Sequence, residues 1–140
     1  MGGHRAGEIA SRVVMDQFVN CFDSIPPFDN VDELKKWVNE TIYEADAIVK
    51  RMAKQNVEHH GMGTTIVVAI LMDNVIYISH VGDSRAYVLK NDQLMQLTKD
   101  HTLVNALGYA SGVLKAQQRR ILRIEIHDDV FVICCVSTAR

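Results

Sequence analysis

The sequence of 140 residues has no large excess of positive or negative charge and no long apolar run, and each of these absences argues against a class of function. The formal net charge is only −2, a balance that gives no reason to expect nucleic acid or an anionic membrane as a partner. The longest apolar stretches, 65–72 and 130–136, have the length of strands and are too short to cross a bilayer. No secretory signal peptide is expected, because Met1 is followed by glycines and a helix start rather than by an apolar run.

Cysteine is also scarce, with three residues at Cys21, Cys134 and Cys135. The odd number and the adjacent pair exclude a disulfide framework, so buried free thiols in a reducing cytosol are expected, with a cytoplasmic location. Hydrophobic residues make up 48% and charged residues 23% of the chain. This composition is that of a folded domain with a real core rather than a disordered segment.

Two amphipathic helices are predicted in the first 55 residues. Apolar residues recur at helical spacing over about 8–22 and again over about 30–55. Pro26 and Pro27 end the first helix, because proline cannot continue the hydrogen-bond ladder. Asn30 and Glu33 have the spacing of a capping box at the start of the second.

After Gly63 the pattern changes to strands, which predicts an α+β fold. We expect an antiparallel meander over about 64–97, whose first strand is buried on both faces because its β-branched run is unbroken. A tail over about 108–140 is expected to add a hairpin across His127-Asp128, preceded by a short helix. The six predicted strands are Thr65–Met72, Val75–Val81, Arg85–Lys90, Gln93–Leu97, Arg119–Ile126 and Asp129–Val136, and the short helix spans Thr102–Ala110.

Three glycine-bearing turns are the most informative motifs, and they stand where backbones are expected to pass close to one another or to a ligand. The turns lie in Met1–Gly7, Gly61–Thr65 and Val81–Arg85. Together with Leu97–Val104 they resemble, in order and in type, the bacterial branch of the protein phosphatase 2C (PPM-type) family. The match covers about 1–107 well and 119–134 loosely.

This resemblance implies a serine/threonine phosphatase that hydrolyses phosphoesters with water activated by Mg²⁺ or Mn²⁺. The implied fold is a partial αββα sandwich, in which two antiparallel β-sheets are flanked by helices, and residues 1–140 form an incomplete PPM-type domain. The implied partners are phosphoserine or phosphothreonine proteins and a cognate serine/threonine kinase.

His4 and Asp83 are the candidate site residues that the resemblance supplies. His4 matches the histidine that closes the family's first turn, so contact with substrate phosphate or proton transfer is one interpretation, and capping of the helix start is the other. Asp83 falls on the family's position for a third, weaker metal ion. The alternative is a turn aspartate that accepts backbone N–H bonds with help from Ser84. Arg85 is expected to form an internal salt bridge.

Other polar residues are given structural interpretations. Gly61 and Gly63 do not open a P-loop, because no lysine follows at the right spacing, and close packing between sheets is preferred. A base role is open for His101, although capping of the next helix by Asp100 or Thr102 is favoured. Loop or turn positions are expected for His59, His60, Glu125, Asp128 and Asp129.

The sequence departs from the family pattern at both ends. The match begins after the family's Asp-Gly pair, and the strand at 130–134 is not followed by an acidic Ser-Asp-Gly segment. We therefore expect little or no phosphatase activity from this chain. The alternatives are a non-catalytic pseudophosphatase or binding module, and a truncated gene product whose unpaired sheet edges promote self-association.

Overall fold

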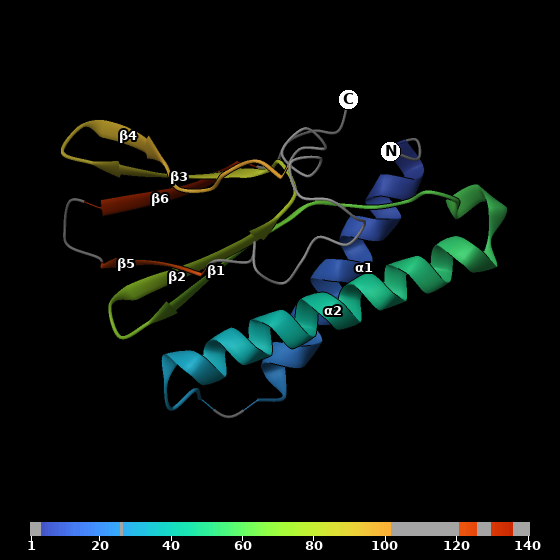
Figure 1. Ribbon diagram of the computed structural model, residues 1–140, viewed down its shortest axis with the longest axis horizontal. Helices are drawn as coiled ribbons and strands as arrows, with labels where there is room; N and C mark the ends of the chain where they lie inside the picture. The colour runs from blue at the N-terminus through green and yellow to red at the C-terminus, as the bar shows by residue number, and fades with distance from the viewer. Residues whose placement is uncertain (1–3, 26, 102–120, 126–129, 136–140) are drawn as a thin grey trace, which may run out of the picture. The chain divides into compact units, whose positions relative to one another are not determined.

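The structure is a computed structural model that describes residues 4–25, 27–101, 121–125 and 130–135. The chain falls into two compact units, which we call the helical unit (within Met1–Thr64) and the β unit (within Thr65–Thr138) (Figure 1). Among the helices of the described residues, none is long and apolar enough to cross a membrane.

The helical unit contains the two predicted helices. Helix α1 spans His4–Asp23 and helix α2 spans Val31–Gln55, and a 3₁₀ turn, η1, follows at Val57–His59. The helices lie side by side (Figure 1), and their buried side chains recur every three or four residues, as the predicted stripes require. These buried residues are Ala6, Ala10, Val14, Leu34, Val38, Thr41, Ile42, Ala45 and Val49.

Aromatic and capping contacts close the connection between the two helices. Trp37 packs against three phenylalanines, with the Phe18 ring centroid 5.8 Å away in an edge-to-face arrangement. The Asn30 side chain accepts hydrogen bonds from the backbone N–H groups of Asp32 and Glu33, which confirms the predicted cap. The Glu33 carboxylate reaches back to the backbone N–H of Asp29 rather than to that of Asn30.

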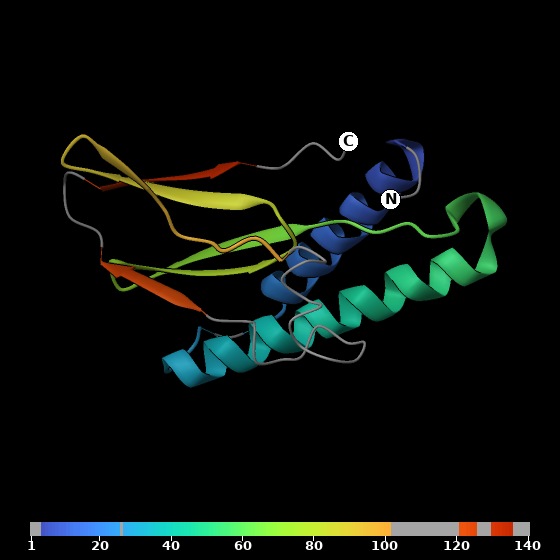
Figure 2. The ribbon, with the colours of Figure 1, turned by 45° about the horizontal axis from the view of Figure 1, so that its top comes forward.

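The β unit consists of two three-stranded antiparallel sheets, drawn as two layers in Figures 1 and 2. One sheet has the order β1-β2-β5 and the other has the order β4-β3-β6. The strands are β1 (Ile66–Met72), β2 (Val75–Val81), β3 (Arg85–Lys90), β4 (Gln93–Gln96), β5 (Leu122–Glu125) and β6 (Val130–Cys135).

The predicted four-stranded meander is wrong, because β2 and β3 belong to different sheets. The two flanking turns, 73–74 and 91–92, each have two residues with positive φ, the conformation that folds a strand back on its neighbour as a tight hairpin. The link between β2 and β3 has positive φ only at Gly82. It therefore carries the chain from one sheet to the other instead of closing a hairpin.

The predicted hairpin across His127-Asp128 is also wrong. Strand β5 pairs with β2, and strand β6 pairs with β3. The central strands β2 and β3 each need partners on both edges to satisfy their backbone N–H and C=O groups, and the two last strands supply the second partner to each. Residues 126–129, with Asp128 and Asp129, lie outside the described residues, as does the predicted helix at 102–110.

Strand β1 differs from the expectation of burial on both faces. None of its residues is buried, and the Leu71 side chain is 66% exposed. Among the described strands β1 has a single neighbour, whereas central β2 contains the fully buried Ile78. An apolar run indicates that a segment is hydrophobic, but it does not indicate whether the strand is central or at an edge of its sheet. The run therefore predicted the strand correctly and its burial incorrectly.

The expectation for the cysteines is tested only in part. Cys21, on α1, is a free thiol and is half-buried. Cys134 and Cys135 end β6, and their side chains lie outside the described part of the structure.

Candidate functional site

The link between the two sheets, Gly82–Arg85, makes close contacts with the residue that precedes β1, and we call it the crossover turn. Gly82 has φ +105°, and a Cβ atom there would lie 2.4 Å from Thr65 Cγ2. Only glycine fits both the backbone angle and the space. Beside it, the hydroxyls of Thr65 and Ser84 are 2.5 Å apart, with Ser84 1% exposed. The turn is therefore held rigidly against the start of β1.

A close approach to another part of the chain is thus found at Gly82 and not at the other described glycines. A Cβ atom added at Gly7, Gly61 or Gly63 would meet nothing within 4 Å. Gly61 has φ +73°, so glycine at this position allows a left-handed backbone conformation and does not provide close packing between sheets.

A second segment, Leu97–His101, runs alongside the crossover turn, and we call it the return segment. Its backbone continues the pairing beyond β4, because Leu97 N donates to Ala86 O at 2.8 Å and His101 N donates to Gly82 O at 2.9 Å. The hydroxyl of Thr98, which is 4% exposed, accepts the backbone N–H of Ala86 at 3.0 Å. The return segment is therefore hydrogen-bonded to Gly82, which begins the crossover turn, and to Ala86, which follows it.

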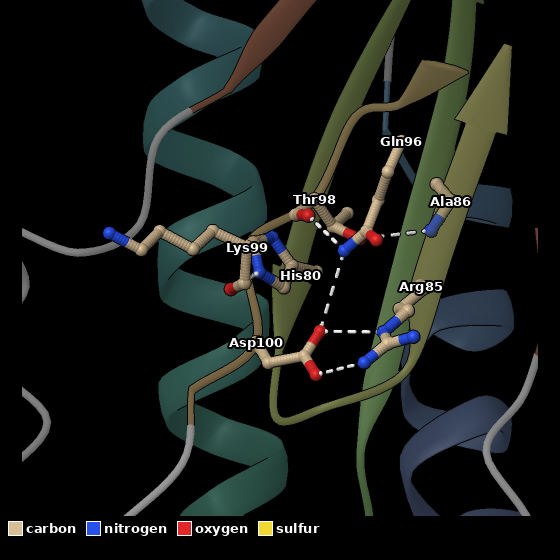
Figure 3. Close-up of polar contacts among 7 residues, drawn as sticks. All are labelled: His80, Arg85, Ala86, Gln96, Thr98, Lys99 and Asp100. Carbon is tan, nitrogen blue, oxygen red and sulfur yellow. Dashed lines mark hydrogen bonds and ion pairs between the residues drawn. The ribbon is translucent and has the colours of Figure 1, made fainter. Parts of the chain in front are cut away.

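An ion pair joins these two segments (Figure 3). Arg85 Nε donates to Asp100 Oδ1 at 2.9 Å and its terminal nitrogen donates to Oδ2 at 2.6 Å, which confirms the predicted internal salt bridge. Gln96 Nε2 donates to Thr98 O at 2.6 Å and lies 3.5 Å from Asp100 Oδ1. The hydrogen bonds from Arg85 lower the pKa of Asp100 and in turn raise the pKa of Arg85. Asp100 therefore binds Arg85. The helix that Asp100 or Thr102 was expected to cap lies outside the described residues.

Replacing Asp100 with asparagine is expected to lower stability at neutral pH but not in acid. A depressed pKa means that the folded state favours the carboxylate, so the stabilisation is present above the ordinary value of 3.8 and is lost as the pH falls through the folded pKa. The urea midpoints of Asp100→Asn and wild type should differ at pH 7 and converge in acid. Asp92→Asn, in an exposed turn, is the control. A midpoint difference that does not change with pH would contradict this linkage.

Two histidines stack between β2 and the return segment. The rings of His80, on β2, and His101, on the return segment, have centroids 4.4 Å apart and planes 21° apart. His80 is 6% exposed and its Nε2 lies 2.9 Å from Lys99 O. The Nδ1 atom of His101 accepts the Gly82 N–H at 3.3 Å. Sequence reasoning missed His80, although a histidine within the apolar run Val75–Val81 was the available signal.

Asp83 stands out because its carboxylate is exposed and accepts no hydrogen bond from the described part of the chain. The interpretation of a turn aspartate bonded to backbone N–H groups is therefore wrong. Ser84, expected to assist it, bonds Thr65 instead. The crossover turn presents the Asp83 carboxylate on a rigid backbone, where it can act as an oxygen ligand.

The other candidates do not join Asp83 in a described cluster. His4 is the first residue of α1 in the helical unit, and its side chain lies outside the described part. His59 ends η1 and His60 follows it, as expected for a loop. Glu125 ends β5 and forms a 2.9 Å ion pair with Arg123. No described contact connects these residues to a common site.

The described residues do not fit a two-metal centre. Within 4–25, 27–101, 121–125 and 130–135, no three His, Cys, Asp or Glu side chains are grouped closely enough to hold a metal ion. Mg²⁺ keeps its waters unless several oxygens compete for it. The single carboxylate of Asp83 is suited to one ligand position and to no more.

The fold and the turn motifs define the class of protein, that of the PPM-type phosphatases. A sequence model described as Protein phosphatase 2C matches residues 1–107. The chain belongs to the protein phosphatase 2C family.

Relatives and solved structures agree with this assignment. The serine/threonine phosphatase stp of Listeria innocua is 38% identical over 107 residues, which cover 76% of this chain and 42% of that protein. The structure of Stp1 from Staphylococcus aureus has a TM-score of 0.68 at 31% identity, covering 96% of this chain and 57% of that one. The catalytic domain of PstP, crystallised with two manganese ions, has a TM-score of 0.63 at 26% identity, covering 96% and 59%. The chain thus spans less than half the length of the stp relative.

Proposed function

We propose that this chain is part of a metal-dependent serine/threonine protein phosphatase, with Asp83 as a ligand for Mg²⁺ or Mn²⁺ at the edge of its cleft. The observation that carries the ligand role is the exposed, unbonded Asp83 carboxylate on a turn fixed by Gly82, Ser84 and Arg85. The two manganese ions in the PstP structure support the choice of cation. His4 is proposed as a catalytic residue, on family resemblance alone.

The proposed substrates are phosphoserine and phosphothreonine proteins, and a serine/threonine kinase that supplies those substrates is the proposed partner. Self-association is proposed from the sheet edges, because β1 and β4 each have one neighbour among the described strands. The exposed side chains of Leu71, Leu94 and Met95 on these strands support it. A cytoplasmic location is proposed from the cysteine pattern.

The ligand role is tested by adding Mn²⁺ to ¹⁵N-labelled protein. Paramagnetic Mn²⁺ bound at Asp83 should broaden the amide signals of Gly82 and Ser84 first, and Asp83→Asn should abolish that broadening. Asp92→Asn, in the exposed turn between β3 and β4, should leave it unchanged. Broadening that survives in Asp83→Asn, or that is no greater at the crossover turn than elsewhere, would remove Asp83 from the proposal.

The activity is tested with p-nitrophenyl phosphate and a phosphothreonine peptide, with Stp1 assayed in parallel. Because the described residues supply one isolated ligand, we expect Mn²⁺-dependent turnover at a small fraction of the Stp1 rate. Turnover equal to that of Stp1 would overturn the expectation of a weak centre. No Mn²⁺-dependent turnover, together with retention of an intact phosphoprotein, would instead establish the non-catalytic binding module.

A further inference from the structure

His101 satisfies both backbone groups of Gly82. The His101 N–H donates to Gly82 O at 2.9 Å, and the Gly82 N–H donates to His101 Nδ1 at 3.3 Å. A ring nitrogen that accepts a hydrogen bond carries no proton, so the neutral His101 ring must carry its proton on Nε2. The contact therefore selects one tautomer and one charge state of His101.

His80 orients the His101 ring. A carbonyl oxygen can only accept, so the 2.9 Å contact between His80 Nε2 and Lys99 O places a proton on His80 Nε2. The buried His80 ring then stacks on His101 at 4.4 Å. Because the rings are stacked, His101 cannot rotate away from Gly82 without losing this contact.

The two segments that hold the His101–Gly82 contact carry four charged residues. The crossover turn supplies Asp83 and Arg85, and the return segment supplies Lys99 and Asp100, of which Arg85 and Asp100 bind each other. The Lys99 side chain extends away from the ion pair (Figure 3). His80 is the titratable group that β2 places against His101.

We infer that His101 is a positioning residue for Asp83, which acts by holding Gly82 through its neutral imidazole. Gly82 directly precedes Asp83, so the direction in which the Asp83 carboxylate leaves the turn depends on the Gly82 backbone. Protonation of His101 at Nδ1 would turn this acceptor into a donor. The two N–H groups would then face each other, and the hydrogen bond from the Gly82 N–H would be lost. The role of Asp83 as a metal ligand rests on the proposed function, whereas the contact between His101 and Gly82 does not depend on it.

The inference is tested by NMR on the ¹⁵N-labelled chain, with no metal and no substrate. Long-range ¹H–¹⁵N spectra near pH 8 should show both histidines as Nε2–H tautomers. On acidification to about pH 5, across the range in which histidine ordinarily titrates, the Gly82 amide shift should move together with the His101 ring signals. A His101 ring protonated on Nδ1 while neutral, or a Gly82 amide that does not respond, would overturn the inference.

Two variants separate positioning from a merely structural role. In His101→Asn, the amide oxygen can accept the Gly82 N–H at every pH, so the pH response of the Gly82 amide should disappear. In His101→Ala, Gly82 amide exchange should be about fivefold faster than in wild type near pH 8, the factor expected for one ordinary hydrogen bond. The difference should disappear near pH 5, where protonation removes the same contact from wild type. A His101→Asn profile that still follows wild type would overturn the inference. If Mn²⁺ causes no broadening at the crossover turn but the Gly82 amide still responds to pH, the proposed ligand role of Asp83 is contradicted and the His101–Gly82 contact is not.

Discussion

Replacing Gly82 with alanine is expected to destabilise the β unit by about 3 kcal/mol or more, because two penalties add at this position. An L-residue at φ +105° stores backbone strain of about 1–3 kcal/mol. The added Cβ would also lie 2.4 Å from Thr65 Cγ2 and 2.8 Å from Thr65 Cβ, and such overpacking costs about 1–3 kcal/mol more. Both terms act at the junction between the two sheets.

Gly61→Ala and Gly7→Ala are matched controls that separate the two penalties. Gly61 has φ +73° with open space around it, so alanine there tests backbone strain alone, with an expected cost of about 1 kcal/mol. Gly7 lies within α1 with nothing within 4 Å of an added Cβ, and alanine there should stabilise the helix by about 0.5–1 kcal/mol. If Gly82→Ala costs no more than Gly61→Ala, the close approach to Thr65 is wrong.

The measurement must report on each unit. Trp37 lies in the helical unit, so tryptophan fluorescence during urea unfolding follows that unit. The amide signals of β2 and β3 follow the β unit. Gly82→Ala should shift the β-unit transition most strongly. Thr65→Ser in the same chain should recover part of the loss, because it removes the Cγ2 atom and keeps the hydroxyl that bonds Ser84.

Local patterns in the sequence predicted the elements well. Helix α2 and the strands β2 and β3 begin and end within a residue of their predicted bounds, because helical periodicity and two-residue turns are local properties. Helix α1 begins at His4 instead of about Glu8. Arg85 was correctly assigned an internal ion pair, although its partner, Asp100, lies 15 positions along the chain and not in the adjacent turn.

The failures in strand pairing and in the candidate site concern contacts between distant segments. Which strand lies beside β5 or β6 depends on the free edges of β2 and β3, which no local pattern of residues 119–136 records. The contacts from His80 to Lys99 and from Gly82 to His101 each span 19 positions along the chain. The hydrogen bond between Thr65 and Ser84 also spans 19 positions, so no local pattern indicates that Ser84 bonds Thr65 rather than Asp83.

Leu34→Ala is expected to cost about 3 kcal/mol, whereas the same substitution at Leu71 should cost less than about 1 kcal/mol. Leu34, on α2, is 0% exposed, so truncation leaves a cavity in addition to losing buried apolar surface. Leu71, on β1, is 66% exposed and has little contact to lose. Urea unfolding of both variants, with Trp37 fluorescence for Leu34→Ala and the β1 and β2 amide signals for Leu71→Ala, gives the comparison.

The Leu71 result also decides whether the open side of β1 stays open in solution. If Leu71→Ala costs as much as Leu34→Ala, that face must be covered by something beyond the described residues. Dilution then identifies a second copy as the cover, because the penalty would shrink as the protein concentration falls. A small penalty at every concentration instead means that the Leu71 side chain stays exposed to solvent, on a strand whose unbroken apolar run carries no charge.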